Sequence, residues 1–455
     1  MRRFATLPFL FFVACSCFGF QLSPRPAVDR QSHKVRVAPF RAPQTRSFEQ
    51  FVGYFTVESG WRTDLQLRNN LSEEGDVPPK YQALTVTPFA RFANGQTVQL
   101  ADVTIGAGNV MSVDVESAIR AKMARVPKIK YGSLLLRYHS FGFNNIYAVA
   151  MIHDHGYPIA FHVDGSGVAK RMEKGSREGI WWLPNATATS YLVVSNYTEK
   201  VTPVEIVIRG SSESGFRRNV IIGANETTRL SIRQLREEAG IIDEWGSISV
   251  QAVANAGGLD SIAFMYDEAA KFSAYFKMFD KDPQSRREER AWNGTADWTL
   301  RAPAVALSSP DPALLFPPKT QLNPNVFVHN TSSHQISYLV RLDWTGVDGK
   351  PGSAVLAPAL IASKETQLLS LRDLQNGGPL PVDAHWATVS ITAACQPEDL
   401  IAMTASYDST MRYGVQNPFS DYLGFQLDGG KWEVERRTTR YPRSVTVQTI
   451  SSELT

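Results

Sequence analysis

Three histidines and an aspartate in the first half of the chain are the clearest candidates for chemistry. His153, Asp154 and His155 follow one another, and His162 comes shortly after them. If these residues lie on strands, alternate positions share a face, so His153 and His155 would point to the same side. His162 and Asp164, from the next strand, would complete the site. Because imidazole is a common zinc ligand, His153, His155 and His162 are candidate metal ligands.

A structural role for the same histidines is the competing interpretation. Two later segments repeat the surrounding pattern, and they have Tyr266 and Tyr407 where this segment has His153. A position that exchanges histidine for tyrosine is typical of packing or of the rim of a strand. We therefore expect no metal and no cofactor, and we keep the metal site as the alternative.

A recurring aspartate also raises the question of acid–base chemistry. Asp154, Asp267 and Asp408 each end an apolar stretch. A catalytic pair needs two carboxylates about 5–9.5 Å apart across a bond, whereas these three belong to separate parts of the chain. Asp often accepts backbone N–H groups in turns, and we expect that role here. Since no nucleophile elbow or phosphate-binding glycine motif is present either, we expect no catalytic residue.

One tryptophan is a candidate for binding sugars. Trp181 and Trp182 are adjacent, so on a strand they would point to opposite faces. We align Trp182 with Phe55 and place it in the core. Trp181 is then the one tryptophan left as a candidate for stacking on a sugar ring.

An internal repeat determines the predicted architecture. Four landmarks recur three times in the same order: an aromatic residue 14 positions before an Asn that ends an alternating strand, a strand that leads into a short helical turn, an aromatic–small–hydroxyl triplet, and a strand that ends in Asp. The first landmark pairs Phe55 with Asn69, Trp182 with Asn196 and Phe316 with Asn330, and the triplets begin at Tyr131, Trp245 and Trp386. Alternation with period two indicates strands with one buried face.

These landmarks predict an all-β fold of three tandem β-sandwich domains, immunoglobulin-like in size, each with one short helical turn. We place the domains at residues 50–166, 178–281 and 301–430. Charged or glycine-rich linkers are expected at residues 165–179 and 280–290. Residues 20–49 are expected to form a disordered basic linker, and residues 431–455 a loosely ordered tail.

The first 19 residues are typical of a signal peptide. Arg2 and Arg3 precede a short apolar run over residues 7–14, and small residues follow. After its removal, 45 basic residues remain against 44 acidic ones, so no strong field would attract nucleic acid. We expect a secreted or cell-envelope protein without a transmembrane helix after signal removal. Cys15 or Cys17 would allow a lipoprotein.

The repeat also resembles a known group of proteins. The aromatic start, the Leu65-x-Leu67-x-Asn69 strand and the Gly-Gly-Lys-Trp ending at Trp432 resemble uncharacterised exported bacterial proteins built from tandem β-sandwich repeats. The resemblance implies export and this fold, and it implies no activity, substrate or cofactor.

The expected function is therefore a non-catalytic array of modules for cell-surface scaffolding, adhesion or polymer binding. Its expected partner is a surface polymer, a polysaccharide or a protein, and not nucleic acid. The alternative is a secreted hydrolase or metal-dependent enzyme with its site in the first repeat.

Overall fold

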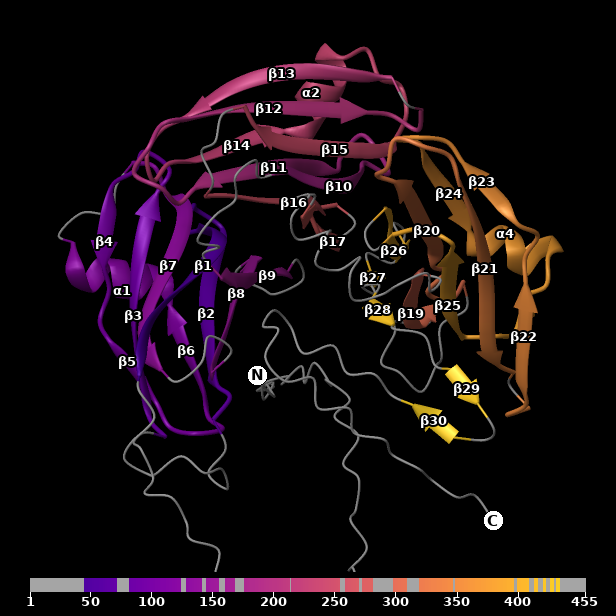
Figure 1. Cartoon of the computed structure of the whole chain (residues 1–455), viewed down its shortest axis with the longest axis horizontal. Helices are drawn as coiled ribbons and strands as arrows, with labels where there is room; N and C mark the ends of the chain where they lie inside the picture. Colours follow the sequence, from indigo (N-terminus) through magenta and orange to yellow (C-terminus); the bar gives the residue numbers. More distant parts are fainter. Residues whose placement is uncertain are drawn as a thin grey trace, which may run out of the picture. The chain divides into compact units, whose positions relative to one another are not determined.

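The computed structural model confirms an all-β chain of three β-sandwich units in tandem (Figure 1). It describes residues 45–71, 82–123, 128–140, 145–154, 160–167, 176–212, 214–253, 258–269, 272–280, 298–308, 319–346, 348–396, 399–408, 413–415, 420–422, 426–428 and 431–433. The predicted signal peptide, Cys15 and Cys17 lie outside these residues. Within them, no helix has the length and apolar character needed to span a bilayer.

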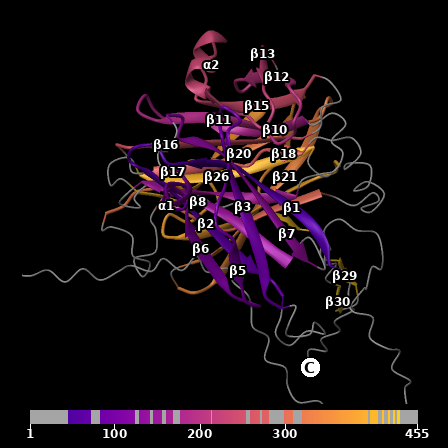
Figure 2. The same cartoon turned by 90° about the vertical axis from the view of Figure 1, so that its left-hand side faces the viewer.

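Repeat 1 contains nine strands and one short helix. They are β1 (Arg46–Thr56), β2 (Trp61–Asn69), β3 (Leu84–Phe92), β4 (Thr97–Gln99), β5 (Val103–Ile105), β6 (Val110–Asp114), α1 (Val115–Lys122), β7 (Tyr131–Ser140), β8 (Ile146–Asp154) and β9 (Ala160–Gly167). The strand order is β4-β3-β7-β1-β9-β8-β2-β6, with β5 beside β3. Strand β9 pairs with β8 through residues 160–164 and with β1 through its last three residues, so it joins the two layers. Figure 2 shows strands of both layers, with β2, β6 and β8 to the left of β1 and β7.

Repeats 2 and 3 each have two separate antiparallel sheets. Repeat 2 comprises β10 (Ser176–Trp182), β11 (Thr189–Asn196), β12 (Thr202–Arg209), β13 (Gly215–Ile222), β14 (Thr227–Ser231), α2 (Ile232–Glu238), β15 (Trp245–Ala252), β16 (Leu259–Asp267), β17 (Phe272–Phe276) and β18 (Phe279–Asp280). Its sheets have the orders β13-β12-β15-β10-β18 and β14-β11-β16-β17.

Repeat 3 follows the same plan. It comprises β19 (Trp298–Ala306), β20 (Asn323–Asn330), β21 (Ile336–Thr345), β22 (Pro351–Val355), β23 (Ala359–Ile361), β24 (Thr366–Ser370), α4 (Leu371–Gly377), β25 (Trp386–Ala393), β26 (Leu400–Asp408), β27 (Tyr413–Val415) and β28 (Ser420–Tyr422). One sheet runs β22-β21-β25-β19-β28 with β23 beside β21, and the other runs β24-β20-β26-β27. A separate hairpin joins β29 (Gln426–Asp428) and β30 (Lys431–Glu433).

Several predicted linker residues belong to strands instead. Strand β1 begins at Arg46, inside the segment expected to be a disordered linker. The ends of the expected linker at 165–179 pair within β9 and β10, because their backbone groups find ladder partners in repeats 1 and 2. The start of the expected tail forms β30.

The Asn that ends the alternating strand is buried in every repeat, and its side chain hydrogen-bonds to the neighbouring turns. Asn196 Nδ2 donates to the carbonyl oxygens of Lys200 at 2.6 Å and Gly223 at 2.9 Å, and its Oδ1 accepts from the Thr198 N–H. Asn69 and Asn330 make the same kinds of contact. These bonds explain why Asn stands at the strand end, since a buried polar side chain needs such partners.

Each predicted helical turn is also present. Helices α1, α2 and α4 directly follow β6, β14 and β24. The last strand residue is the N-cap in each case: Asp114, Ser231 and Ser370 accept from the backbone N–H three residues on. Each short helix also buries two of its side chains.

The small residue of the triplet allows two strands to approach closely. A Cβ added to Gly132 would lie 1.9 Å from the Arg91 carbonyl oxygen, and one added to Gly246 would lie 2.1 Å from that of Arg209. No side chain fits at such distances, so glycine is required at both positions.

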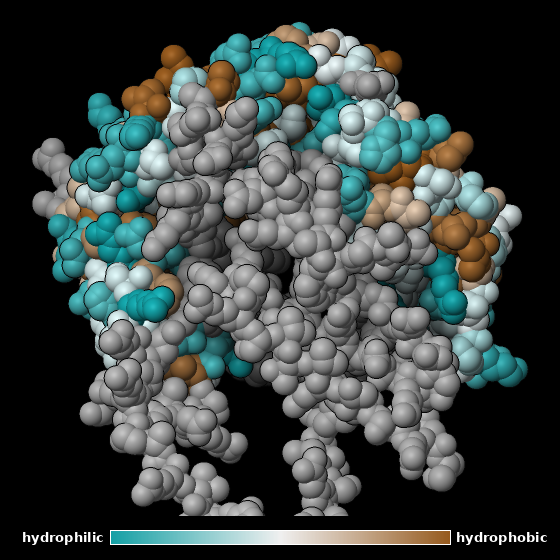
Figure 3. Space-filling model, viewed as in Figure 1, coloured by the Kyte–Doolittle hydropathy of each residue, from teal (hydrophilic) through white to brown (hydrophobic). Residues whose placement is uncertain are grey.

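Apolar and polar residues are mixed on the molecular surface. Figure 3 shows hydrophilic and hydrophobic residues interspersed on the face that it draws. Among the exposed apolar side chains, Ile221 lies in β13 and Ile242 in the connection between α2 and β15, and such scattered exposure is normal for a protein surface.

Candidate functional site at the seams between repeats

The histidine candidates do not form a described metal site. His153 is buried, with Nδ1 2.7 Å from the Asp154 carbonyl oxygen and Nε2 3.1 Å from Asp64 Oδ2. His162 lies in β9 opposite Met151, and His155 lies outside the described residues. In the part of the chain that the structure describes, no group of three or more His, Cys, Asp or Glu side chains is placed to hold a metal.

The sequence predicted that all three strand-ending aspartates accept backbone N–H groups, and the structure shows this for Asp267 and Asp408. Asp267 Oδ2 accepts from Asn185 Nδ2 at 2.6 Å, and its Oδ1 accepts from the Ala269 N–H. Asp408 Oδ2 accepts from the Gln321 N–H at 2.6 Å. These carboxylates have structural partners in two different sandwiches.

Trp181 offers no ring for stacking on a sugar, because its side chain is fully buried. Its indole Nε1 donates to the carbonyl oxygens of Arg209 and Ser247. Strand register also shows that Trp181, and not Trp182, corresponds to Phe55, because Trp181 pairs with Gly246 as Phe55 pairs with Gly132. Trp182 is buried as predicted, but it contacts repeat 3, where its ring lies 5.5 Å from that of Phe327.

The four-stranded sheet of repeat 2 is buried on both faces, which creates a seam with repeat 1. Leu192 and Val194 of β11 face the core of repeat 2, whereas Val193 between them joins the core of repeat 1. On β16, Ile262 and Phe264 also join the core of repeat 1. The outer face of this sheet is therefore an interface and not a solvent surface.

The same seam recurs between repeats 2 and 3. Phe327 of β20, together with Ile401 and Met403 of β26, belongs to the core cluster of repeat 2. One backbone hydrogen bond is repeated too: the Thr227 N–H donates to the Ala93 carbonyl across the first seam, and the Thr366 N–H donates to that of Ser211 across the second. Both seams thus join equivalent elements in the same order.

The outer face of the corresponding layer in repeat 1 is polar rather than apolar. Strand β2 places Asp64, Gln66 and Arg68 at the positions that β11 fills with residues of the seam. Gln66 and Arg68 are exposed, whereas Val193 and Ser195 are buried. Repeat 1 thus has the polar outer face of a terminal repeat.

An aromatic pocket of about 60 Å³ opens at the first seam. Repeat 1 and repeat 2 both line it, with the residues Tyr54, Thr56, Glu58, Trp61, Phe161, Tyr191, Arg229, Phe264 and Tyr266. The rings pack against one another: Phe161 and Phe264 stack with centroids 4.4 Å apart, and Trp61 meets Tyr266 edge-on at 4.9 Å.

A single arginine organises the polar side of this pocket. Arg229 donates to Glu58 Oε2 at 2.6 Å and Oε1 at 3.1 Å, and to the Tyr54 hydroxyl at 3.0 Å. Its guanidinium also lies over the rings of Tyr131 and Tyr191, at 4.5 and 4.8 Å. Such two-point pairing fixes both charged groups in place.

The pocket environment shifts several pKa values. Burial lowers the pKa of Arg229, but the hydrogen bonds and charge of Glu58, with Tyr54, outweigh it and raise that pKa overall. Burial raises the pKa of Tyr54 well above its ordinary value, and that of Tyr266 to about 12. The arginine therefore stays charged and the tyrosines stay neutral at physiological pH.

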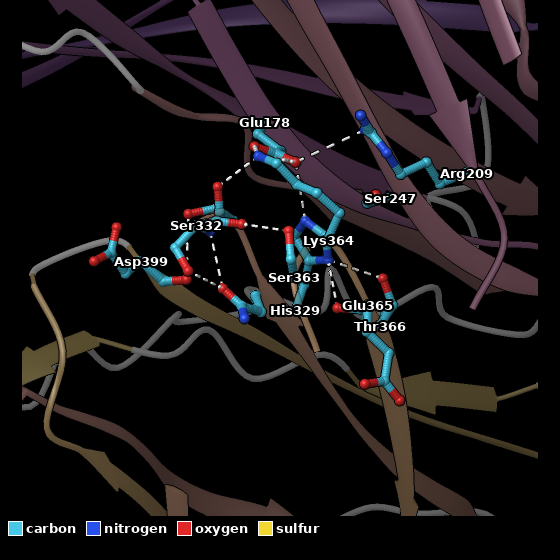
Figure 4. A network of polar contacts seen from close by, with 12 residues as sticks. Glu178, Arg209, Ser247, His329, Ser332, Ser363, Lys364, Glu365, Thr366 and Asp399 are labelled. Atoms are coloured by element: carbon cyan, nitrogen blue, oxygen red, sulfur yellow. Dashed lines mark hydrogen bonds and ion pairs between the residues drawn. The ribbon is translucent and has the colours of Figure 1, made fainter. Parts of the chain in front are cut away.

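The second seam contains a buried ionic network instead (Figure 4). Glu178 is 2% exposed, and its carboxylate lies 2.9 Å from Lys364 Nζ and 3.1 Å from His329 Nε2. On the other side of the ring, His329 Nδ1 lies 2.9 Å from the Glu365 carbonyl oxygen. Partners on repeat 3 thus compensate for burying a carboxylate of repeat 2.

The seams are what the sequence-based reasoning missed, although the sequence carries a signal for them. Strand β2 alternates cleanly as Asp-Leu-Gln-Leu-Arg, whereas β11 contains the continuous run Tyr191-Leu192-Val193-Val194. A continuous apolar run indicates a strand that is buried on both faces.

Comparison with protein-family models gives no match for this chain, and no curated protein matches it either.

Proposed function

We propose that this chain is an exported, non-catalytic array of β-sandwich modules that serves cell-surface scaffolding, adhesion or polymer binding. The observation that carries the proposal is the repeated seam. Equivalent elements meet at both seams, with outward-facing apolar residues such as Val193 and Phe327 buried in a neighbouring module. A chain built in this way holds its modules in a fixed sequence and presents one continuous surface to a partner.

The contacts of His153 favour binding over metal-dependent catalysis. Both of its ring nitrogens lie within hydrogen-bond distance of an oxygen of Asp64 or Asp154. A histidine held in this way packs between strands and has no nitrogen directed at a ligand.

Export and partner choice are part of the same proposal. The charged start at Arg2 and Arg3 and the short apolar run after it support secretion or placement in the cell envelope, with lipidation at Cys15 or Cys17 as a variant. The near balance of charge favours a polysaccharide, another surface polymer or a protein over nucleic acid as the partner.

The test combines location, binding and turnover. The full chain is expressed with its own N-terminus, and the N-terminal sequence of the secreted or envelope fraction should begin near Phe20. The purified protein is then incubated with insoluble peptidoglycan, cellulose and chitin, with and without zinc. Retention on a polymer without release of soluble fragments is the expected result.

A metal-dependent enzyme with its site in repeat 1 would give a different result in this assay. Zinc-dependent release of fragments that disappears in His155→Ala would contradict the non-catalytic proposal. The matched control is His334→Ala, a histidine of the same type on the turn after β20 in repeat 3. An intact Met1 in the cytoplasm would contradict export.

A further inference from the structure

Both seams bury apolar residues at equivalent positions. Val193 and Phe327 each lie three residues before the Asn that ends their strand, and both are buried at a seam. Ile262 and Met403 each lie five residues before the Asp that ends theirs, and they are buried in the same way. Docking of the wrong module is a characteristic failure of repeat proteins. Apolar burial of the same kind at both seams gives little protection against it, so selection between modules needs another feature.

The strand that receives the next module differs between the two seams. Phe51 of β1 and Glu178 of β10 each pair with the residue three positions after the glycine of the triplet. They therefore occupy equivalent positions, and both are at most 2% exposed. The first seam has a phenyl ring at this position, whereas the second has a carboxylate.

The module that docks carries a matching difference. At the first seam, the Phe51 ring lies 5.1 Å from the ring of Tyr197, the residue after the strand-ending Asn of repeat 2. At the second seam, the Glu178 carboxylate lies 2.9 Å from Lys364 Nζ and 3.1 Å from His329 Nε2 (Figure 4). One seam thus joins two aromatic rings, and the other joins a carboxylate to an ammonium and an imidazole.

Repeat 2 has uncharged residues at the equivalent positions of its own docking surface. Ser195 stands where repeat 3 has His329, since each pairs with the first residue of β14 or β24. Asn225 stands where repeat 3 has Lys364, two residues before that strand, and the two share a left-handed backbone with φ of 57° and 60°. The surface of repeat 2 therefore offers a hydroxyl and an amide where repeat 3 offers an imidazole and an ammonium.

We propose that Glu178, Lys364 and His329 form a recognition key that confines repeat 3 to docking on repeat 2. In a swapped contact, Glu178 would be buried against the hydroxyl and amide of a surface like that of repeat 2, without the Lys364 ammonium. The Arg209 guanidinium of its own module is 4.0 Å away, beyond hydrogen-bond distance. A buried charge that loses its partner destabilises an interface strongly, whereas an intact buried pair adds little net stability, so the pair discriminates between partners more than it stabilises. The key concerns how the modules select one another and does not depend on what the array binds.

Two backbone amides report the opening of the seams in the full chain. The Thr366 N–H donates to the Ser211 carbonyl across the second seam, and the Thr227 N–H donates to the Ala93 carbonyl across the first. Hydrogen–deuterium exchange at single-residue resolution measures both. Lys364→Asn, which installs the residue of repeat 2, should lower the protection of the Thr366 amide about a hundredfold, since an unpaired buried charge costs about two tenfold steps or more. The protection of the Thr227 amide should not change.

A second substitution distinguishes lost charge pairing from general damage. Adding Glu178→Gln to Lys364→Asn removes the stranded carboxylate and should regain at least about tenfold of the lost protection. Lys350→Asn is the matched control, because Lys350 pairs with Asp348 but is 82% exposed, and it should change neither amide. The key is not what selects repeat 3 if Lys364→Asn lowers protection by less than about threefold, if it affects both amides equally, or if the double variant is no better than the single.

Transplanting the key to the first seam tests its selectivity. Phe51→Glu gives repeat 1 the carboxylate of repeat 2 and should lower the protection of the Thr227 amide, because repeat 2 docks with Asn225 where repeat 3 has Lys364. Adding Asn225→Lys supplies the ammonium and should regain at least about tenfold of that protection, with the Thr366 amide unchanged throughout. Failure of the second substitution to regain protection would overturn the proposal that this pair selects the partner module.

Discussion

Replacing Arg229 by methionine should strongly destabilise the seam between repeats 1 and 2. The change removes the paired hydrogen bonds to Glu58, the bond to the Tyr54 hydroxyl, and the stacking over Tyr131 and Tyr191. Charge-assisted hydrogen bonds contribute about 1.5–3 kcal/mol, and a partly desolvated cation–π contact contributes about 0.5–2 kcal/mol. The methionine keeps the apolar stem, and both side chains of the pair are partly exposed, so we count one charge-assisted contact and one cation–π contact and expect a loss of about 2–5 kcal/mol.

A matched arginine on the surface provides the control. Arg217 lies 3.1 Å from both carboxylate oxygens of Glu205, but its side chain is 68% exposed, against 21% for Arg229. Exposed ion pairs contribute about 0–1 kcal/mol, so Arg217→Met should change stability little. Urea unfolding followed by tryptophan fluorescence measures both variants. If the two losses agree within about 0.5 kcal/mol, the seam pair is no more important than a surface pair and the reasoning fails.

Three other perturbations follow from the fold. Asn196→Asp should cost about 2–4 kcal/mol in urea unfolding, because a carboxylate would face the carbonyl oxygens that the amide now binds. Gly132→Ala should cost at least about 2–3 kcal/mol, since no space exists for its Cβ. For Tyr266, whose burial raises the pKa to about 12, the stabilising effect is full below about pH 10 and is lost as the pH rises through 12. Tyr266→Phe should therefore flatten the alkaline loss of stability.

Each of these predictions has a result that would contradict it. Asn219→Asp on the exposed face of β13 should be nearly neutral, and an equal loss there would point to a general charge effect. Gly377→Ala has nothing within 4 Å of the new Cβ, so a loss matching that of Gly132→Ala would exclude the steric explanation. For Tyr266→Phe, an unchanged stability profile between pH 10 and 12 would show that the other buried tyrosines alone cause the alkaline loss.

The sequence was informative wherever a local pattern decides the structure. Strand ends at Asn69, Asn196 and Asn330, and the start of each helical turn, depend on residues close together in the chain. Their spacing could therefore be compared directly between repeats. The all-β class followed from the same short-range alternation.

What the sequence did not predict depends on how distant parts meet. By strand register, Trp182 corresponds to Thr56 and not to Phe55. The stretch from this position to the landmark Asn is one residue shorter in repeat 1, because Asn69 lies 13 residues after Thr56 and Asn196 lies 14 after Trp182. An alignment by equal spacing therefore failed. The seam pocket needs Arg229 and Glu58 to come together across two sandwiches. No spacing rule within one repeat contains that contact.

The polar row on β2 also has a consequence for self-association. A head-to-tail contact that repeats without closing would continue into an open-ended fibre if every outer face accepted the next copy. Asp64, Gln66 and Arg68 occupy the positions where a neighbouring chain would need to bury apolar side chains. Burying these polar side chains without partners would cost free energy, so the face of repeat 1 disfavours the head-to-tail contact that the seams make.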